Sequence, residues 1–277
     1  MIDCDVVVIG AGAIVLATAA QLVENGLSVI IVEKERLVGS HSTSRNSEVI
    51  HSGIYYKESS AKETFCLEGK ERLYSFLLAR GVPFNNCGKI LFCNDINGQE
   101  KLESLYQNAK RCEIKVKYCE KAKLEKVNQI ANATAAVEVY DTGIFDSHVY
   151  LQSLINIIEN HGGILALNTD VIDLDANYAQ LKTVCRQNLD DFIIRSKYVI
   201  NAAGSNALNL LKSYYSEKYS SYSNFFVKGH YFSCKRFSSI NQLYYPLPND
   251  LGLGVHLTCD LNGAVKLVMI KIILRMQ

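Results

Sequence analysis

The residues Gly10-Ala11-Gly12 could bind phosphate through their backbone N–H groups. These residues follow the apolar run of residues 4–9 and open a segment of helical pattern. Free N–H groups and the positive end of a helix dipole bind phosphate at such a turn, and glycines let the backbone approach it closely. Glu33 follows about 20 residues further on, at the spacing of the acid that holds an adenosine ribose. The two features together predict a dinucleotide site.

Val15 departs from this pattern, because it stands where a third glycine is expected. That glycine lets the helix pack closely on the strand, and overpacking at such a place costs about 1–3 kcal/mol. We therefore expect weaker cofactor binding, or a helix that lies slightly further from the sheet.

A βαβ unit must position the glycine turn. Residues 4–9 and 28–33 are typical of buried parallel strands, and residues 13–25 have the pattern of a helix that ends at Gly26. The parallel strands imply a right-handed crossover. Further helices are expected at 59–80, 99–111 and 147–160, a turn at Asn97-Gly98, and strands at 88–94, 164–167, 170–174, 197–202, 225–235, 242–246 and 253–258. We expect an α/β fold with a mixed α+β insertion, and an exposed connection over the Ser- and Tyr-rich residues 213–224.

Composition excludes several classes of function. A net charge of +1 gives no general attraction to nucleic acid or to an anionic membrane, and stacking of bases on the tyrosines of 213–224 would need a basic patch that is missing there. Nine cysteines without a CxxC pair favour reduced thiols in a cytoplasmic protein over disulfides or a zinc site, so we expect no metal. The sequence shows neither a signal peptide nor an apolar run long enough to span a membrane.

Several motifs resemble the L-2-hydroxyglutarate dehydrogenase (oxidase) family, within the D-amino-acid-oxidase superfamily of flavoproteins. The most specific is the run from Arg45 to Tyr56, RNSEVIHSGIYY. The likeness extends from residue 4 to about 266 and includes Glu33-Lys34-Glu35, Cys87-Gly88-Lys89, residues 142–146, Asn201-Ala202-Ala203-Gly204, residues 228–232, residues 245–248 and residues 252–258. The resemblance implies FAD as cofactor, held by a discontinuous Rossmann-like domain at 1–81 and 141–210. It also implies an incomplete substrate domain at 82–140 and 211–277.

The resemblance implies roles for individual residues. FAD contacts are expected at Gly10, Gly12, Glu33, Lys34, Ser44, Arg45, Asn46, Ser47, His51, Ser52, Gly53, Val171, Ala203 and Gly204. Val171 also suits a core position. Substrate contacts are expected at Tyr55, Tyr56, Lys228, Tyr231 and Tyr245, whose hydroxyl or cationic groups suit a carboxylate.

The implied reaction oxidises a 2-hydroxy acid to a 2-oxo acid, with hydride leaving C2 for flavin N5 and a base taking the hydroxyl proton. Histidine is the usual base near neutral pH. His51 and His256 are the candidates and His230 is third, whereas His41, His148 and His161 are expected to be solvent or cap residues. The electron acceptor, oxygen or a quinone, stays open, as does peripheral contact with the inner membrane face.

The resemblance stops after Lys266, where the apolar tail no longer follows the family. We expect a truncated or frame-shifted copy, in which missing strands leave sheet edges open. The alternatives to an active hydroxyacid dehydrogenase are a flavoenzyme acting on an amine or on glycerol 3-phosphate, a non-catalytic remnant, and an NAD-dependent dehydrogenase.

Overall fold

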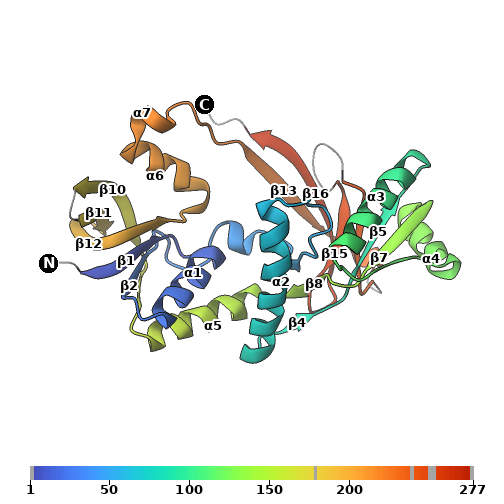
Figure 1. The fold of residues 1–277 in the computed structure, drawn as a ribbon, viewed down its shortest axis with the longest axis horizontal. Helices are drawn as coiled ribbons and strands as arrows, with labels where there is room; N and C mark the ends of the chain where they lie inside the picture. Colours follow the sequence, from blue (N-terminus) through green and yellow to red (C-terminus); the bar gives the residue numbers. More distant parts are fainter. Residues whose placement is uncertain (1–2, 178–179, 238–239, 249–253, 275–277) are drawn as a thin grey trace. The chain divides into compact units, whose positions relative to one another are not determined.

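A computed structural model describes residues 3–177, 180–237, 240–248 and 254–274. The chain divides into two compact units, each built from two segments (Figure 1). The first unit comprises Met1–Asn46 and Ser147–Asn224, and the second Ser47–Asp146 and Phe225–Gln277. The predicted FAD-domain boundaries at 81, 141 and 210 differ from these limits and stay a prediction.

The first unit is built on a six-stranded sheet in the order β10-β11-β12-β1-β2-β9. Its strands are β1 (Cys4–Ile9), β2 (Val29–Val32), β9 (Ile164–Ala166), β10 (Thr169–Asn177), β11 (Gln180–Gln187) and β12 (Asp190–Asn201). β12, β1, β2 and β9 are mutually parallel, whereas β10, β11 and the start of β12 form an antiparallel meander. The predicted α/β class and βαβ unit are confirmed; the β11 hairpin was not foreseen.

Helices α1 (Ala13–Glu24) and α5 (Ser147–Asn160) belong to this unit, with α6 (Ala207–Tyr214), α7 (Ser216–Tyr219) and 3₁₀ turns at Ser42–Ser44 and Gly204–Asn206. α1 ends where predicted, because Gly26 adopts a φ of 81° beyond its C-cap. The exposed connection expected at 213–224 is instead partly helical, in α6 and α7.

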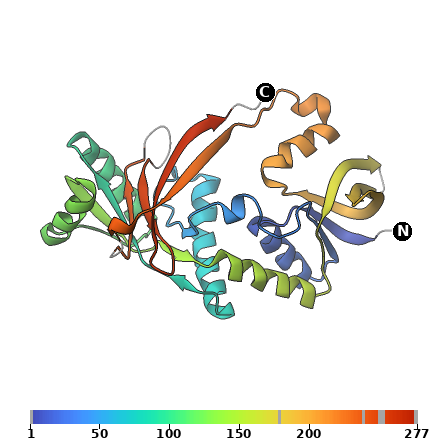
Figure 2. The same ribbon diagram turned by 180° about the vertical axis from the view of Figure 1, so that it is seen from behind.

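The second unit has a seven-stranded sheet in the order β13-β16-β15-β14-β5-β7-β6, and a small sheet β3-β8-β4. The large sheet contains β5 (Lys89–Cys93), β6 (Val116–Tyr118), β7 (Ala135–Val139), β13 (Phe226–Ser233), β14 (Leu243–Pro246), β15 (His256–Cys259) and β16 (Val265–Leu274). The small sheet contains β3 (Val49–Ile50), β4 (Phe84–Asn85) and β8 (Gly143–Phe145). Both ribbon views show β13 and β16 side by side in orange and red (Figure 2).

Three helices complete the second unit, α2 (Ala61–Arg80), α3 (Asn97–Arg111) and α4 (Lys121–Ala131), together with a 3₁₀ turn at Lys235–Phe237. β5 is buried along its whole length, because α3 and α4 pack on opposite faces of the sheet. Leu91 and Cys93 join a core cluster with α3, while Ile90 and Phe92 join one with α4. Side chains alternate along a strand, so Lys89 shares the face of Leu91.

One local prediction was wrong, and one helix was not foreseen. Asn97-Gly98 is the first part of α3 and not a turn, because the Asp95 carboxylate accepts the Gly98 N–H at 2.7 Å and starts the helix. α4 was missed. The departing segment after Lys266 lies in β16, which pairs with β13 and β15. The predicted strand 253–258 is observed over His256–Cys259. Its first residue, Leu253, and Gly252 of the motif 252–258 lie outside the described residues.

Candidate cofactor site and buried lysine–histidine cluster

The glycine turn lies between β1 and α1, at the carboxyl end of the parallel strands. Gly10 has a φ of 106°, which favours glycine, and its N–H donates to Val32 O at 2.8 Å. A Cβ at Gly10 would lie 2.9 Å from Ala202 O, and one at Gly12 would lie 3.0 Å from Thr43 Oγ1. Gly10 is therefore required by close packing against the backbone after β12, whereas a Cβ at Gly12 would require the Thr43 side chain to shift.

Glu33 ends β2 and its carboxylate holds this turn. Its Oε2 accepts the Ala11 N–H at 2.6 Å, and its Oε1 accepts the Glu35 N–H at 2.8 Å. Glu33 is only 9% exposed. Each carboxylate oxygen has further acceptor capacity, which suits the hydroxyls of a ribose.

The N-terminus of α1 is suited to an anion. Gly12 provides no side-chain cap, and the described first turn contains no acidic residue. Thr43 Oγ1 accepts the Ala13 N–H at 3.1 Å. Unpaired N–H groups at the positive end of a helix attract phosphate.

Val15 is 1% exposed, and its Cγ2 would lie 3.3 Å from a Cβ at Gly10. The valine therefore fills the space that a third glycine would leave between helix and turn. The weaker cofactor binding expected from Val15 stays a prediction.

These elements border an open cleft of about 810 Å³ within the first unit. The cleft is lined by residues of the glycine turn, the end of β2, the polar loop, β10 and the turn after β12: residues 9–12, 32–34, 39–43, 169–171, 202–206 and 210. The predicted contacts Gly10, Gly12, Glu33, Lys34, Val171, Ala203 and Gly204 are all among them.

The polar loop contributes different residues from those expected. Ser42 and Thr43 line the cleft, whereas Ser44, Arg45 and Asn46 lie beyond its lining. Asn46 Nδ2 donates to the carbonyls of Ser42 and Thr43, and Ser44 Oγ donates to His41 O, so these side chains shape the loop. Thr43, Thr169 and Asp170 were missed. Thr43 stands two residues before the quoted motif, so its hydroxyl was a visible signal.

The other predicted residues of the motif belong to the second unit, where Tyr55 and His51 lie near a buried lysine. Lys89 is 1% exposed. Its Nζ lies 4.3 Å from the centroid of the Tyr55 ring and 5.4 Å from that of Tyr245. The Tyr245 and His256 rings are 4.2 Å apart between centroids. Lys89, Tyr55, Tyr245 and His256, with the nearby His51, are termed the lysine–histidine cluster.

Burial and mutual repulsion set the protonation of this cluster. Burial lowers the pKa of Lys89 to about 7. Burial, Lys89 and His256 together lower the pKa of His51 to about 4, and burial lowers that of His256. Burial raises the pKa of Tyr55 and of Tyr245. Both histidines are therefore neutral near pH 7 and can accept a proton.

The tautomer of His256 follows from its partner. His256 Nδ1 lies 3.1 Å from Gly254 O, and a carbonyl only accepts. Nδ1 therefore carries the proton and Nε2 is left as an acceptor.

The remaining predicted substrate residues, Tyr56, Lys228 and Tyr231, are not members of the lysine–histidine cluster. Tyr231 lies on β13, 40% exposed, and its hydroxyl is 3.0 Å from Ser47 Oγ. Lys228 is exposed on the same strand and Tyr56 is half-buried. Gly53 is packed against Leu67, and the buried Ser52 Oγ has no hydrogen-bond partner among the described residues.

Lys89 was missed as a candidate site residue, although the period of two along its strand places it with Leu91.

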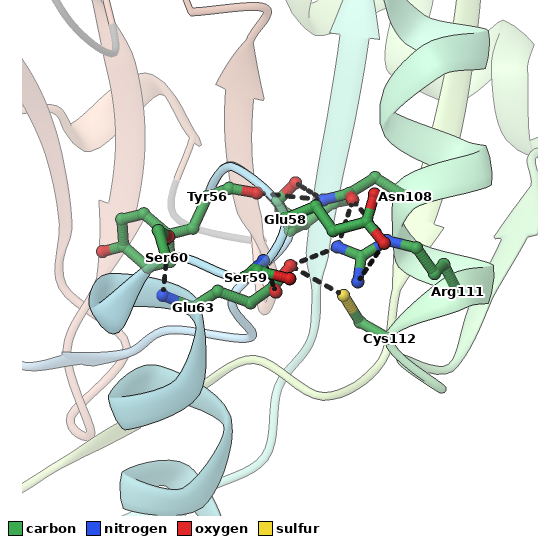
Figure 3. A network of polar contacts seen from close by, with 9 residues as sticks. Tyr56, Glu58, Ser59, Ser60, Glu63, Asn108, Arg111 and Cys112 are labelled. Carbon is green, nitrogen blue, oxygen red and sulfur yellow. Dashed lines mark hydrogen bonds and ion pairs between the residues drawn. The ribbon is translucent and has the colours of Figure 1, made fainter.

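A polar network fixes the segment that carries Tyr55 (Figure 3). Asn108 on α3 donates to Ile54 O at 3.0 Å and to Tyr56 O at 3.3 Å. Arg111 donates to the Glu63 carboxylate and lowers the pKa of Glu63. Glu63 also accepts the Ser59 N–H at 2.8 Å, while Ser60 caps α2. The network ties the beginning of α2 to the end of α3.

Parallel strands with a glycine turn, an acid after the second strand and a cleft at their carboxyl edge form a dinucleotide-binding domain. The chain belongs to the DAO family of FAD dependent oxidoreductases, whose pattern matches residues 5–269. Its cofactor is FAD, and the glycine turn, Glu33 and the cleft fit the pyrophosphate and ribose of that group.

Curated relatives agree with the resemblance found in the sequence. The mitochondrial L-2-hydroxyglutarate dehydrogenase of Arabidopsis thaliana is 28% identical over 296 residues, covering 95% of this chain and 61% of the relative. The L-2-hydroxyglutarate dehydrogenase of Escherichia coli K12 is 28% identical over 270 residues, covering 94% and 62%. The chain thus spans about three fifths of the length of these relatives.

Solved structures share the fold. The L-alpha-glycerophosphate oxidase of Mycoplasma pneumoniae with FAD bound has a TM-score of 0.83 at 20% identity, over 97% of this chain and 72% of that one. The L-proline dehydrogenase of P. horikoshii has a TM-score of 0.77 at 17% identity, over 96% and 69%. Among the described residues, no helix is long and apolar enough to cross a membrane and no group of side chains could hold a metal ion.

Proposed function

We propose that the chain serves in the FAD-dependent oxidation of an L-2-hydroxy acid, most specifically L-2-hydroxyglutarate to 2-oxoglutarate. The observation that carries the proposal is the lysine–histidine cluster, a buried cation beside two neutral imidazoles. A hydroxy acid requires both a cation for its carboxylate and a base for its hydroxyl proton. The 28% identity to L-2-hydroxyglutarate dehydrogenases supports the choice of substrate.

The two units divide the work in this proposal. Bound FAD supplies a hydride acceptor at N5. In the first unit, the N-terminus of α1 holds the pyrophosphate and Glu33 holds the ribose. In the second unit, His256 Nε2 takes the hydroxyl proton of the substrate, because its Nδ1 is committed to Gly254 O. His51 is the alternative base, since it too is neutral near pH 7.

Anaerobic titration of the flavin-loaded protein tests this function. Addition of L-2-hydroxyglutarate is expected to bleach the flavin absorbance, while glycerol 3-phosphate and amino acids leave it unchanged. Bleaching by glycerol 3-phosphate or by an amine alone would replace the proposed substrate. A yellow protein that no donor reduces would instead identify a non-catalytic relative.

The electron acceptor can be tested in the same preparation. We propose a cytoplasmic protein that passes its electrons to oxygen or to a quinone, in the latter case at the inner membrane face. Oxygen consumption during turnover favours the first acceptor. Turnover only with an added quinone favours the second.

A further inference from the structure

Lys89 is a buried cation that the fold leaves without an anion. Among the residues that the structure describes, no carboxylate forms an ion pair with its Nζ, and its charged form rests only on the faces of Tyr55 and Tyr245. Cation–π contacts offset only part of the cost of removing an ammonium from water. A lysine that served packing alone would be replaced at lower cost by a methionine.

Three buried hydroxyls that belong to members of the cluster, or lie one or two residues from them in sequence, also lack a hydrogen-bond partner within the described part of the chain. Tyr55 Oη, Ser52 Oγ and Thr258 Oγ1 are buried without a hydrogen-bond partner among the described residues. Buried polar groups normally have one. Tyr55 contacts Lys89 through its ring, Ser52 adjoins His51, and Thr258 lies on the same strand as His256. Hydroxyls and an ammonium without acceptors are the groups that a carboxylate satisfies.

We infer that the lysine–histidine cluster is a carboxylate-binding site, in which Lys89 gives the ion pair and Tyr55 a hydrogen bond. The inference rests on the proposed function to the extent that the bound carboxylate belongs to the hydroxy-acid substrate. The ligand class is a small carboxylate, and a dicarboxylate if the second acid group reaches solvent.

Proton uptake on binding is the distinctive consequence. Burial holds the pKa of Lys89 near 7, and a bound carboxylate supplies the missing counter-charge and favours the ammonium. The other titratable groups facing Lys89 are His51, Tyr55, Tyr245, His256 and Cys66 of α2. The two tyrosines and Cys66 already hold their protons at pH 8, because burial raises their pKa values. The lowered pKa values of His51 and His256 lie further below pH 8 than that of Lys89, so Lys89 is the group expected to take up the proton.

Calorimetric titration of the flavin-loaded protein with glutarate tests this inference, because glutarate has no hydroxyl to oxidise. In buffers of different ionisation enthalpy at pH 8, the wild type is expected to take up most of one proton per glutarate. Its affinity should fall about tenfold for each pH unit above the pKa of Lys89. Lys89→Met is expected to bind at least tenfold more weakly, without proton uptake, and Lys89→Arg to retain binding without proton uptake.

The matched control is Lys117→Met, which removes an exposed lysine of the same sheet that is paired with Glu120; its binding should equal that of the wild type. Unchanged glutarate affinity in Lys89→Met, or equally tight binding of uncharged glutaramide to the wild type, would overturn the inference. The outcome is separable from the proposed function. If hydroxyglutarate bleaches the flavin but Lys89→Met binds glutarate like the wild type, only the inference is wrong. If glutarate binding depends on Lys89 but hydroxyglutarate does not bleach the flavin, only the proposed function is wrong.

Discussion

At the scale of single residues, Glu33 holds the glycine turn and is the residue that we propose binds the ribose of FAD. Its carboxylate accepts the N–H groups of Ala11 in the glycine turn and of Glu35, two residues further along the chain, and it also faces the cleft. A sequence spacing of about 20 residues was sufficient to find it, because the acid, strand and turn are local to one βαβ unit.

Glu33→Gln separates these two tasks. The amide oxygen can still accept the Ala11 N–H, but the negative charge that holds ribose hydroxyls is lost. We expect FAD affinity to fall by about 10–100-fold, or ~1.5–3 kcal/mol for a hydrogen bond to a charged group. The free energy of unfolding should also fall by about 1–3 kcal/mol, because the amide nitrogen cannot accept the Glu35 N–H that Glu33 Oε1 accepts. Flavin fluorescence titration measures the FAD affinity. Glu35→Gln, which removes the neighbouring acid that bonds His41, should bind like the wild type.

Gly10→Ala tests whether the glycine turn must lie close to the Ala202 carbonyl. Gly10 and Gly26 both have positive φ values, but a Cβ at Gly26 meets nothing within 4 Å, whereas one at Gly10 lies 2.9 Å from Ala202 O. Gly26→Ala should therefore cost only the backbone strain, about 1 kcal/mol. Gly10→Ala should cost more and abolish flavin retention. Equal loss of melting temperature in the two variants would argue against the steric requirement.

At the scale of elements, the packing of α1 on the sheet depends on Val15. Val15 is 1% exposed and Ile14, its neighbour on the helix, is 77% exposed. Val15→Ala is expected to lower the free energy of unfolding by about 1–3 kcal/mol through the cavity it leaves. Ile14→Ala should remain within about 0.5 kcal/mol of the wild type. Urea unfolding compares them, and a stabilised Val15→Ala would instead support overpacking by the valine.

The buried ammonium of Lys89 on strand β5 lowers the free energy of unfolding. The pKa of Lys89 is about 7 in the folded chain against 10.5 for an ordinary lysine. The unfolded chain therefore binds more protons between these values, and stability rises with pH across that window. Lys89→Met should be more stable than the wild type by on the order of 3–5 kcal/mol below pH 7, and this advantage should shrink toward pH 10. A pH-independent difference would contradict the assignment.

Local elements followed from the sequence better than long-range ones. The strand at residues 88–94 was predicted from its apolar run, and its alternation already placed Lys89 on the face of Leu91. The approach of Tyr245 and His256 to Lys89 depends on pairing across β5, β14 and β15, and no local pattern encodes that pairing. α4 and β11 were missed for a different reason, because their apolar patterns are weak. Val127 is the one buried residue found in α4, and β11 pairs with its sequence neighbours β10 and β12.

At the scale of the whole molecule, FAD should contribute to stability. A ligand that binds only the folded state adds about 2.7 kcal/mol at a concentration of 100 times its dissociation constant. For a chain of this length that corresponds to a rise in melting temperature of roughly 5–10 °C. Thermal unfolding with FAD should show this rise, and NAD⁺ at the same concentration should not. A larger shift with NAD⁺ would favour a nicotinamide-dependent dehydrogenase.

Strand β12 has a consequence for how this chain tolerates changes of length. Its residues up to Ser196 pair antiparallel with β11, and those from Ser196 to Asn201 pair parallel with β1. The hairpin tip carries Asn188 at a φ of 57° and Leu189, which is 93% exposed. Residues added at that tip would leave every strand partner in place. One residue added after Ser196 would exchange the two faces of the strand end and carry the Ala202–Gly204 turn away from Gly10. The distance from Ser196 to Gly204 is therefore fixed by the glycine turn, whereas the length of the β11–β12 hairpin is free to vary.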